Sequence, residues 1–101
     1  MTSAKRSPTI PDVPTIGESG LAGYDVSQWY GVSVVAGTPG EIIAKIHSDL
    51  ADIIKMPDIR SRMADLGVEP VGNTPAQFSE LIRSEIVKYR KIVKDTQITI
   101  N

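Results

Sequence analysis

The run of residues at 28–35 constrains the fold of this chain more than any other segment. It is rich in aromatic and β-branched side chains, and the stretch from Val32 to Ala36, which begins in its second half, is almost wholly apolar. Such a composition is typical of a β-strand that is covered on both faces. A strand of this kind needs partners on both sides, and the rest of the chain offers few of them.

Helix signals dominate the sequence after this run. The expected elements are helices at 39–55, 57–66 and 75–95 and short strands near 28–35, 68–71 and 97–100. The first and third helices open at the proline-containing capping boxes Thr38-Pro39-Gly40-Glu41 and Thr74-Pro75-Ala76-Gln77. Apolar side chains then recur every three or four residues. Pro70 makes the second strand an edge strand. These elements predict an α/β fold.

The composition bounds the function as well as the size. A chain of 101 residues forms one domain at most. The formal net charge is -1, and no basic stripe is present, which argues against nucleic-acid binding. The sequence has no cysteine, so disulfides and thiolate chemistry are excluded. No apolar run reaches the roughly 20 residues needed to span a bilayer.

Few residues are candidates for chemistry. The single histidine, His47, flanks the apolar stripe of the first helix and lacks the spacing of a metal motif. We therefore predict no catalytic residue, no metal site and no cofactor. Trp29 and Tyr30 could line a ligand cleft, or they could simply pack at the start of a strand. The guanidinium of Arg6 could meet a carboxylate, or it could lie in a solvated linker.

Several motifs together carry a family resemblance. They are Pro11-Asp12-Val13-Pro14-Thr15, Glu18-Ser19-Gly20, Trp29-Tyr30-Gly31, Ala36-Gly37-Thr38-Pro39 and Gly67-Val68-Glu69-Pro70-Val71-Gly72 followed by Thr74-Pro75. This set resembles the C-terminal part of the Bug-type periplasmic solute-binding proteins. Proteins of that family capture small organic acids for tripartite tricarboxylate transporters. The resemblance runs from about Thr2 onward and covers only the last third of such a protein.

The resemblance implies a two-lobed α/β clamp, of which this chain is the C-terminal portion. Residues 1–15 would be the crossover segment between the lobes, and 16–101 would be the C-terminal part of the first lobe, an incomplete domain. The glycine-rich loops that grip the ligand carboxylate in such proteins are not in this chain. Of the residues present, the resemblance leaves Trp29, Tyr30 and Arg6 as ligand-binding candidates.

The resemblance also implies where the parent protein works and with what. The parent would be a non-enzymatic periplasmic receptor whose partners are a small carboxylate ligand and membrane transporter subunits. No signal peptide is visible, so the signal is expected to belong to a longer precursor. The alternative is a stand-alone small α/β protein-interaction module without small-molecule binding. In either case, unpaired sheet edges favour self-association of the chain.

Overall fold

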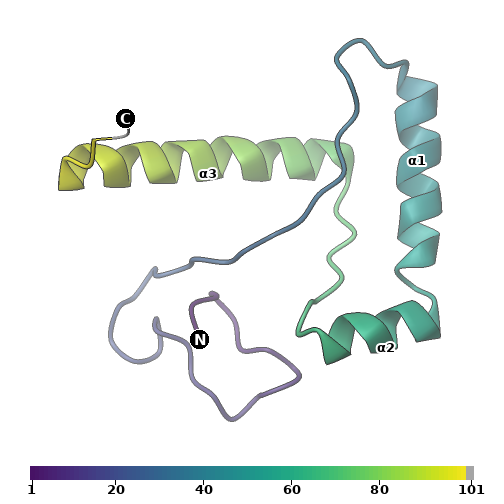
Figure 1. Cartoon of the computed structure of the whole chain (residues 1–101). Coiled ribbons are helices and arrows are strands. Elements are labelled where there is room, and N and C mark those ends of the chain that lie inside the picture. The colour runs from purple at the N-terminus through teal and green to yellow at the C-terminus, as the bar shows by residue number, and fades with distance from the viewer. Residues whose placement is uncertain (100–101) are drawn as a thin grey trace.

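Three helices make up the regular structure of this computed structural model, which describes residues 1–99. They are α1 at Gly40–Ile53, α2 at Pro57–Asp65 and α3 at Pro75–Thr96 (Figure 1). The three predicted helices are confirmed, with ends that differ by one or two residues. That difference lies within the usual uncertainty of helix boundaries.

The two capping predictions had different outcomes. At α3, the Gln77 amide donates to Thr74 Oγ1 at 3.2 Å, and the Thr74 amide donates to Gln77 Oε1 at 2.9 Å, so the capping box is confirmed. At α1 the prediction was wrong. The Thr38 hydroxyl donates to the Val35 carbonyl at 2.7 Å instead. The reason is that Pro39 is the N-cap, which starts the helix one residue later than expected.

The predicted strands do not form within residues 1–99. The segments 28–35 and 68–71 are extended but unassigned, and residues 97–99 form no strand, while residue 100 lies outside the described residues. A strand is defined by its hydrogen-bonded ladder, and no backbone hydrogen bond joins residues 27–34 to any other described residue. At 68–71, the Val68 amide instead donates to Met63 at 2.8 Å and closes α2. The helices of the predicted α/β fold are therefore confirmed, whereas its strands are not confirmed within residues 1–99.

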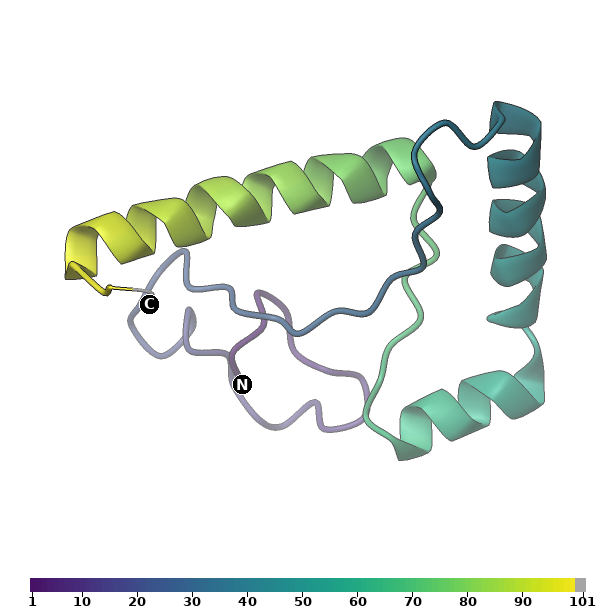
Figure 2. The same ribbon diagram turned by 45° about the horizontal axis from the view of Figure 1, so that its top comes forward.

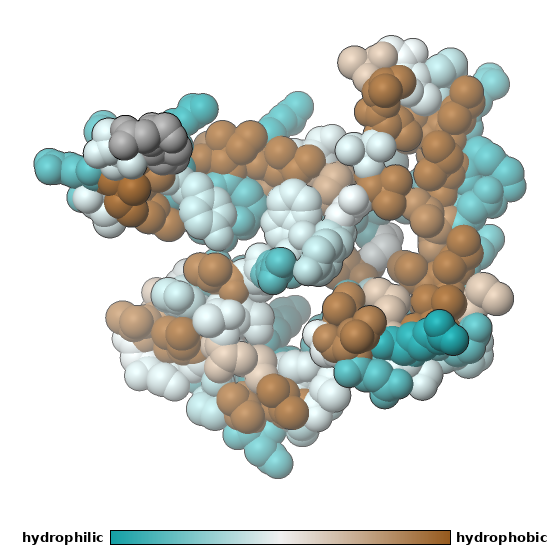
Figure 3. All heavy atoms as spheres, viewed as in Figure 1, coloured by the Kyte–Doolittle hydropathy of each residue, from teal (hydrophilic) through white to brown (hydrophobic). Residues whose placement is uncertain are grey.

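The elements enclose no apolar core. Among the described residues no hydrophobic side chain is buried, and the one buried residue is Thr15, at 2% exposure. The radius of gyration is 16.7 Å, against about 13 Å for a compact chain of this length. Apolar side chains remain open along α1 and α2 (Figure 3). Within residues 1–99 no helix is both long and apolar enough to cross a membrane.

The N-terminal residues form a folded-back loop unit beside the helices (Figure 2). The Ile16 amide donates to the Met1 carbonyl at 2.9 Å, and the Val26 amide donates to the Thr2 carbonyl at 2.9 Å. These bonds tie residues 1–26 together. From there the chain runs past α3 and then turns into α1 (Figures 1 and 2).

Candidate functional site

The segment that carries Trp29 and Tyr30 lies against α3. The Trp29 ring meets Phe78 edge to face, with ring centroids 5.3 Å apart and an interplanar angle of 89°. Gly31 comes so close that a Cβ atom there would overlap the Phe78 ring. Aromatic pairs favour this T-shaped arrangement. Trp29 therefore packs against α3 in this structure. Packing was one of the two interpretations that the sequence left open.

A second contact fastens the same segment to α3 from the other end. Lys88 Nζ donates to the Asp25 carbonyl at 2.9 Å and pairs with Glu85 Oε1 at 2.7 Å. The hydrogen bond to Glu85 raises the pKa of Lys88. Because Asp25 meets Lys88 while Trp29 meets Phe78, the segment runs antiparallel to α3.

An open groove of about 510 Å³ lies between the segment and α3. Its lining includes Gln28, Trp29, Ile82, Glu85, Ile86 and Tyr89. The wall is mainly apolar, and its one carboxylate, on Glu85, would repel a carboxylate ligand. A smaller hollow of about 350 Å³ lies in the N-terminal unit, and its lining includes Glu18 and Asp25. These two carboxylates would likewise repel a carboxylate ligand. Neither hollow is suited to an organic acid by itself.

Tyr30 points away from this packing. In an extended segment, neighbouring side chains lie on opposite sides, so the contact of Trp29 with α3 directs Tyr30 outward. Tyr30 is 79% exposed. Its hydroxyl oxygen accepts a hydrogen bond from Gln28 Nε2 at 3.1 Å. The phenolic proton donates to no acceptor among the described residues, so it is available to an acceptor such as a carboxylate.

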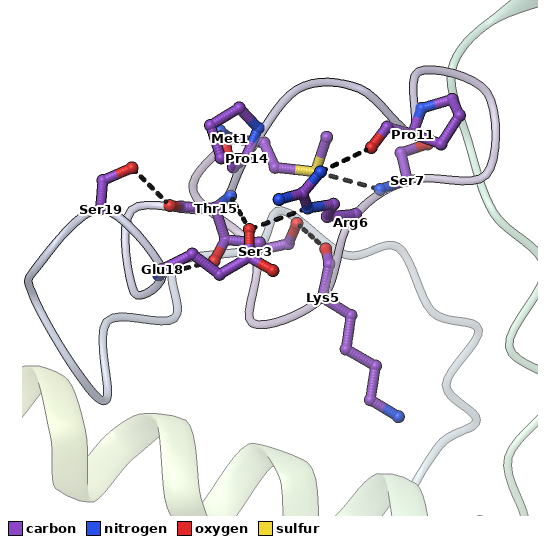
Figure 4. A network of polar contacts seen from close by, with 10 residues as sticks. All are labelled: Met1, Ser3, Lys5, Arg6, Ser7, Pro11, Pro14, Thr15, Glu18 and Ser19. Carbon is purple, nitrogen blue, oxygen red and sulfur yellow. Dashed lines mark hydrogen bonds and ion pairs between the residues drawn. The ribbon is translucent and has the colours of Figure 1, made fainter.

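Arg6 lies in the N-terminal unit, where it is used for an internal network (Figure 4). Its Nε is 2.8 Å from Glu18 Oε2, and its Nη1 donates to the Pro11 carbonyl at 3.0 Å. Glu18 Oε2 also accepts the Thr15 amide at 3.0 Å, and Thr15 Oγ1 accepts the Glu18 amide at 3.1 Å. The backbone hydrogen bond from Thr15, followed by that from Arg6, lowers the pKa of Glu18.

The sequence analysis did not predict this network, although the spacing of Thr15 and Glu18 indicated part of it. Thr15-Ile16-Gly17-Glu18 follows the capping-box pattern of a threonine with a glutamate three residues later. Here it closes a single turn, in which the Ser19 amide donates to the Thr15 carbonyl at 3.1 Å. The structure thus places Arg6 in a different unit from Trp29 and Tyr30. Within residues 1–99 no cluster of potential ligands could hold a metal ion.

Comparison with protein families gives one match across nearly the whole chain. The family described as "Tripartite tricarboxylate transporter family receptor" matches residues 1–98. Among curated proteins, the chain is 31% identical over 102 residues to the "UPF0065 protein in tcbD-tcbE intergenic region" of Pseudomonas sp. (strain P51). That match covers 100% of this chain and 30% of the relative. Protein BugT of Bordetella pertussis is 30% identical over 94 residues, which cover 93% of this chain and 29% of BugT.

Solved structures agree with these matches. The periplasmic binding protein BugD superposes with a TM-score of 0.78 at 31% identity, over 96% of this chain and 33% of BugD. The R. palustris protein Rpa4515, solved with adipate, gives a TM-score of 0.75 at 31% identity, over 92% of this chain and 31% of its own. The chain therefore spans about a third of the length of each of these four proteins.

Proposed function

The chain belongs to the tripartite tricarboxylate transporter receptor family, and on that premise we propose that it is one part of a periplasmic receptor for a small organic carboxylate. The observation that carries the proposal is the family match over residues 1–98. The superposition on BugD supports it. The family is one of solute-binding receptors, not of enzymes.

The proposed parent receptor delivers its ligand to membrane transporter subunits from the periplasm. Within it, the chain forms the last third, with residues 1–15 crossing between lobes and 16–101 finishing the first lobe. The resemblance of the sequence motifs supports this placement. The hydrogen bonds that bind residues 1–26 into one unit would then join the crossover to the residues that follow it.

The proposed ligand is an acid because a related structure contains adipate and because Tyr30 offers a matching donor. Tyr30 would donate its phenolic proton to a ligand carboxylate, while Gln28 holds the phenol in place. Trp29 would support Tyr30 through its contact with Phe78. Arg6 would shape the crossover through Glu18 and contact the ligand only if that ion pair opens. Most of the grip would come from loops elsewhere in the receptor.

A grafted receptor tests this function. The chain replaces the matching third of BugD, and isothermal titration calorimetry measures binding of adipate, succinate and citrate. We expect at least one of these acids to bind, and the neutral diamide of the same acid to bind far more weakly. Tyr30→Phe should weaken acid binding about tenfold or more, because a hydrogen bond to a charged group is lost. A folded graft that binds none of the three acids contradicts the proposal.

A further inference from the structure

We propose that Lys88 is a positioning residue: it fixes the segment from Asp25 to Tyr30 on α3 and so sets the place from which Tyr30 donates to a ligand carboxylate. The inference rests on the proposed function, because that function assigns the ligand contact to Tyr30. Lys88 itself would not touch the ligand. The inference starts from the bonds that Lys88 makes to Asp25 and Glu85.

Lys88 joins α3 to the N-terminal unit, residues 1–26. Its Nζ donates to the Asp25 carbonyl at 2.9 Å, across 63 positions of sequence. Among the described residues this is the one hydrogen bond between the unit and α3. The side chain of Asp25 belongs to the same junction, because its Oδ1 accepts the Ala4 amide at 3.1 Å and the Ser27 hydroxyl at 3.1 Å. Lys88 therefore holds the point where the N-terminal unit passes into the extended segment.

The spacing of two anchors on α3 leaves the segment little slack. Lys88 meets Asp25, and Phe78 meets Trp29. The two anchors are ten residues apart on the helix, which corresponds to a rise of about 15 Å. From Asp25 to Trp29 the extended chain advances four residues and reaches about 13 Å, and the length of the lysine side chain supplies the remainder. The segment is thus drawn straight between its anchors, and release of either anchor would let it bend.

Tyr30 directly follows the second anchor, so its hydroxyl moves when the segment moves. Gln28 Nε2 donates to the Tyr30 hydroxyl at 3.1 Å, and both residues belong to the segment. Among the described residues no hydrogen bond ties the Tyr30 side chain to α3. The place of the phenol relative to the helix therefore depends on the two anchors. Phe78 fixes one end of the segment, and Lys88 fixes its direction.

The surroundings of Lys88 hold its ammonium group in place. Glu85 Oε1 pairs with Lys88 Nζ at 2.7 Å, and the two side chains are 18% and 32% exposed, so salt screens this pair less than a fully exposed one. Lys45 forms a similar pair with Asp49 on α1, at 2.8 Å. Its side chain is 75% exposed, and among the described residues it makes no hydrogen bond outside that helix. Lys45 is therefore a matched control for the loss of a lysine.

A double-mutant cycle in the BugD graft tests the inference. Lys88→Met keeps the unbranched stem and removes the donor. Isothermal titration calorimetry measures binding of adipate, succinate and citrate. We expect Lys88→Met to weaken acid binding about fivefold or more when Tyr30 is present, and less than about twofold when Tyr30→Phe is also present. A purely structural role would weaken binding alike in both backgrounds, and that result overturns the inference.

Further variants separate the hydrogen bond from the charge. Lys88→Arg keeps the cation and its donors and should stay within about threefold of the unsubstituted graft. Glu85→Gln removes the carboxylate but leaves an acceptor for Lys88, and it should also stay within about threefold. Lys45→Met should leave acid affinity unchanged. Circular dichroism checks that each graft is folded. If Lys88→Met does not fold, Lys88→Gln, which leaves a polar group beside Glu85, takes its place in the cycle.

The inference and the proposed function fail in different ways. A folded graft that binds none of the three acids refutes the proposed function, and the inference falls with it. A graft that binds an acid equally well with and without the Lys88 donor keeps the proposed function and refutes the inference alone.

Discussion

Gly31 is the point at which the extended segment approaches α3 most closely. Gly31→Ala would place a methyl group in the Phe78 ring, and overpacking of this kind costs about 1–3 kcal/mol. We expect Trp29, the sole tryptophan, to lose its contact with Phe78, and its fluorescence emission to shift to longer wavelength. Gly40→Ala is the control, because a Cβ atom there meets no neighbour within 4 Å. An unchanged spectrum for Gly31→Ala would refute the docked segment.

The turn at Thr15 should respond to acid through Glu18. The pKa of Glu18 lies below its ordinary value of 4.5, mainly because its carboxylate accepts the Thr15 amide and then the Arg6 guanidinium. A lowered pKa means that the carboxylate stabilises the turn above about pH 4.5 and that this contribution disappears as the pH falls through the folded-state value. The Thr15 amide resonance should therefore titrate in NMR with a midpoint below 4.5.

Two variants decide whether Glu18 is responsible for that titration. Glu18→Gln should abolish it, since the amide does not titrate in this range. Glu41→Gln, at the first turn of α1, should leave it unchanged. A midpoint above 4.5 in the unsubstituted chain would contradict the hydrogen bonds at this turn.

At the scale of the elements, helices were predictable because their signals are local. Pro57, Gly67 and the box at Thr74 each act within one turn of the helix end that they set. The strand at 28–35 is not confirmed, because a strand forms only with a pairing partner, and no local pattern supplies one. The same held for the candidate site, where only contacts between residues close in sequence could be predicted. Thr15 and Glu18 could have been paired from their spacing, whereas Trp29 meets Phe78 across a long stretch of chain.

Thr38 and Thr74, which precede α1 and α3, give a matched test of helix capping. Thr74→Ala removes the hydroxyl that accepts the Gln77 amide and should destabilise the first turn of α3 by about 1 kcal/mol. Thr38→Ala should leave α1 nearly unchanged, because Thr38 caps no amide of that helix. Carbon chemical shifts of the first helical turn measure both effects. Equal losses at the two helices would contradict the cap assigned to Pro39.

At the scale of the whole molecule, stability depends on what the chain is joined to. Burial of apolar surface gives unfolding its large heat-capacity change and, at high temperature, much of its enthalpy, and within residues 1–99 no hydrophobic side chain is buried. A compact domain of about 100 residues absorbs about 60–80 kcal/mol at its melting temperature. We expect the separate chain, studied by scanning calorimetry at low micromolar concentration, to lose its helices gradually, without a heat-absorption peak of that size.

Joining the chain to the rest of a receptor should change this behaviour. In the BugD graft the apolar faces of α1 and α3 would be covered, so a single cooperative transition should appear. The matched control is the same graft with Ile42→Asp, at a site that is 50% exposed in the separate chain. This substitution should leave the separate chain's gradual melting unchanged and lower the melting temperature of the graft, because a charge would be buried at the new contact. A sharp endotherm from the separate chain as a monomer would show instead that its three helices form a stable core unaided.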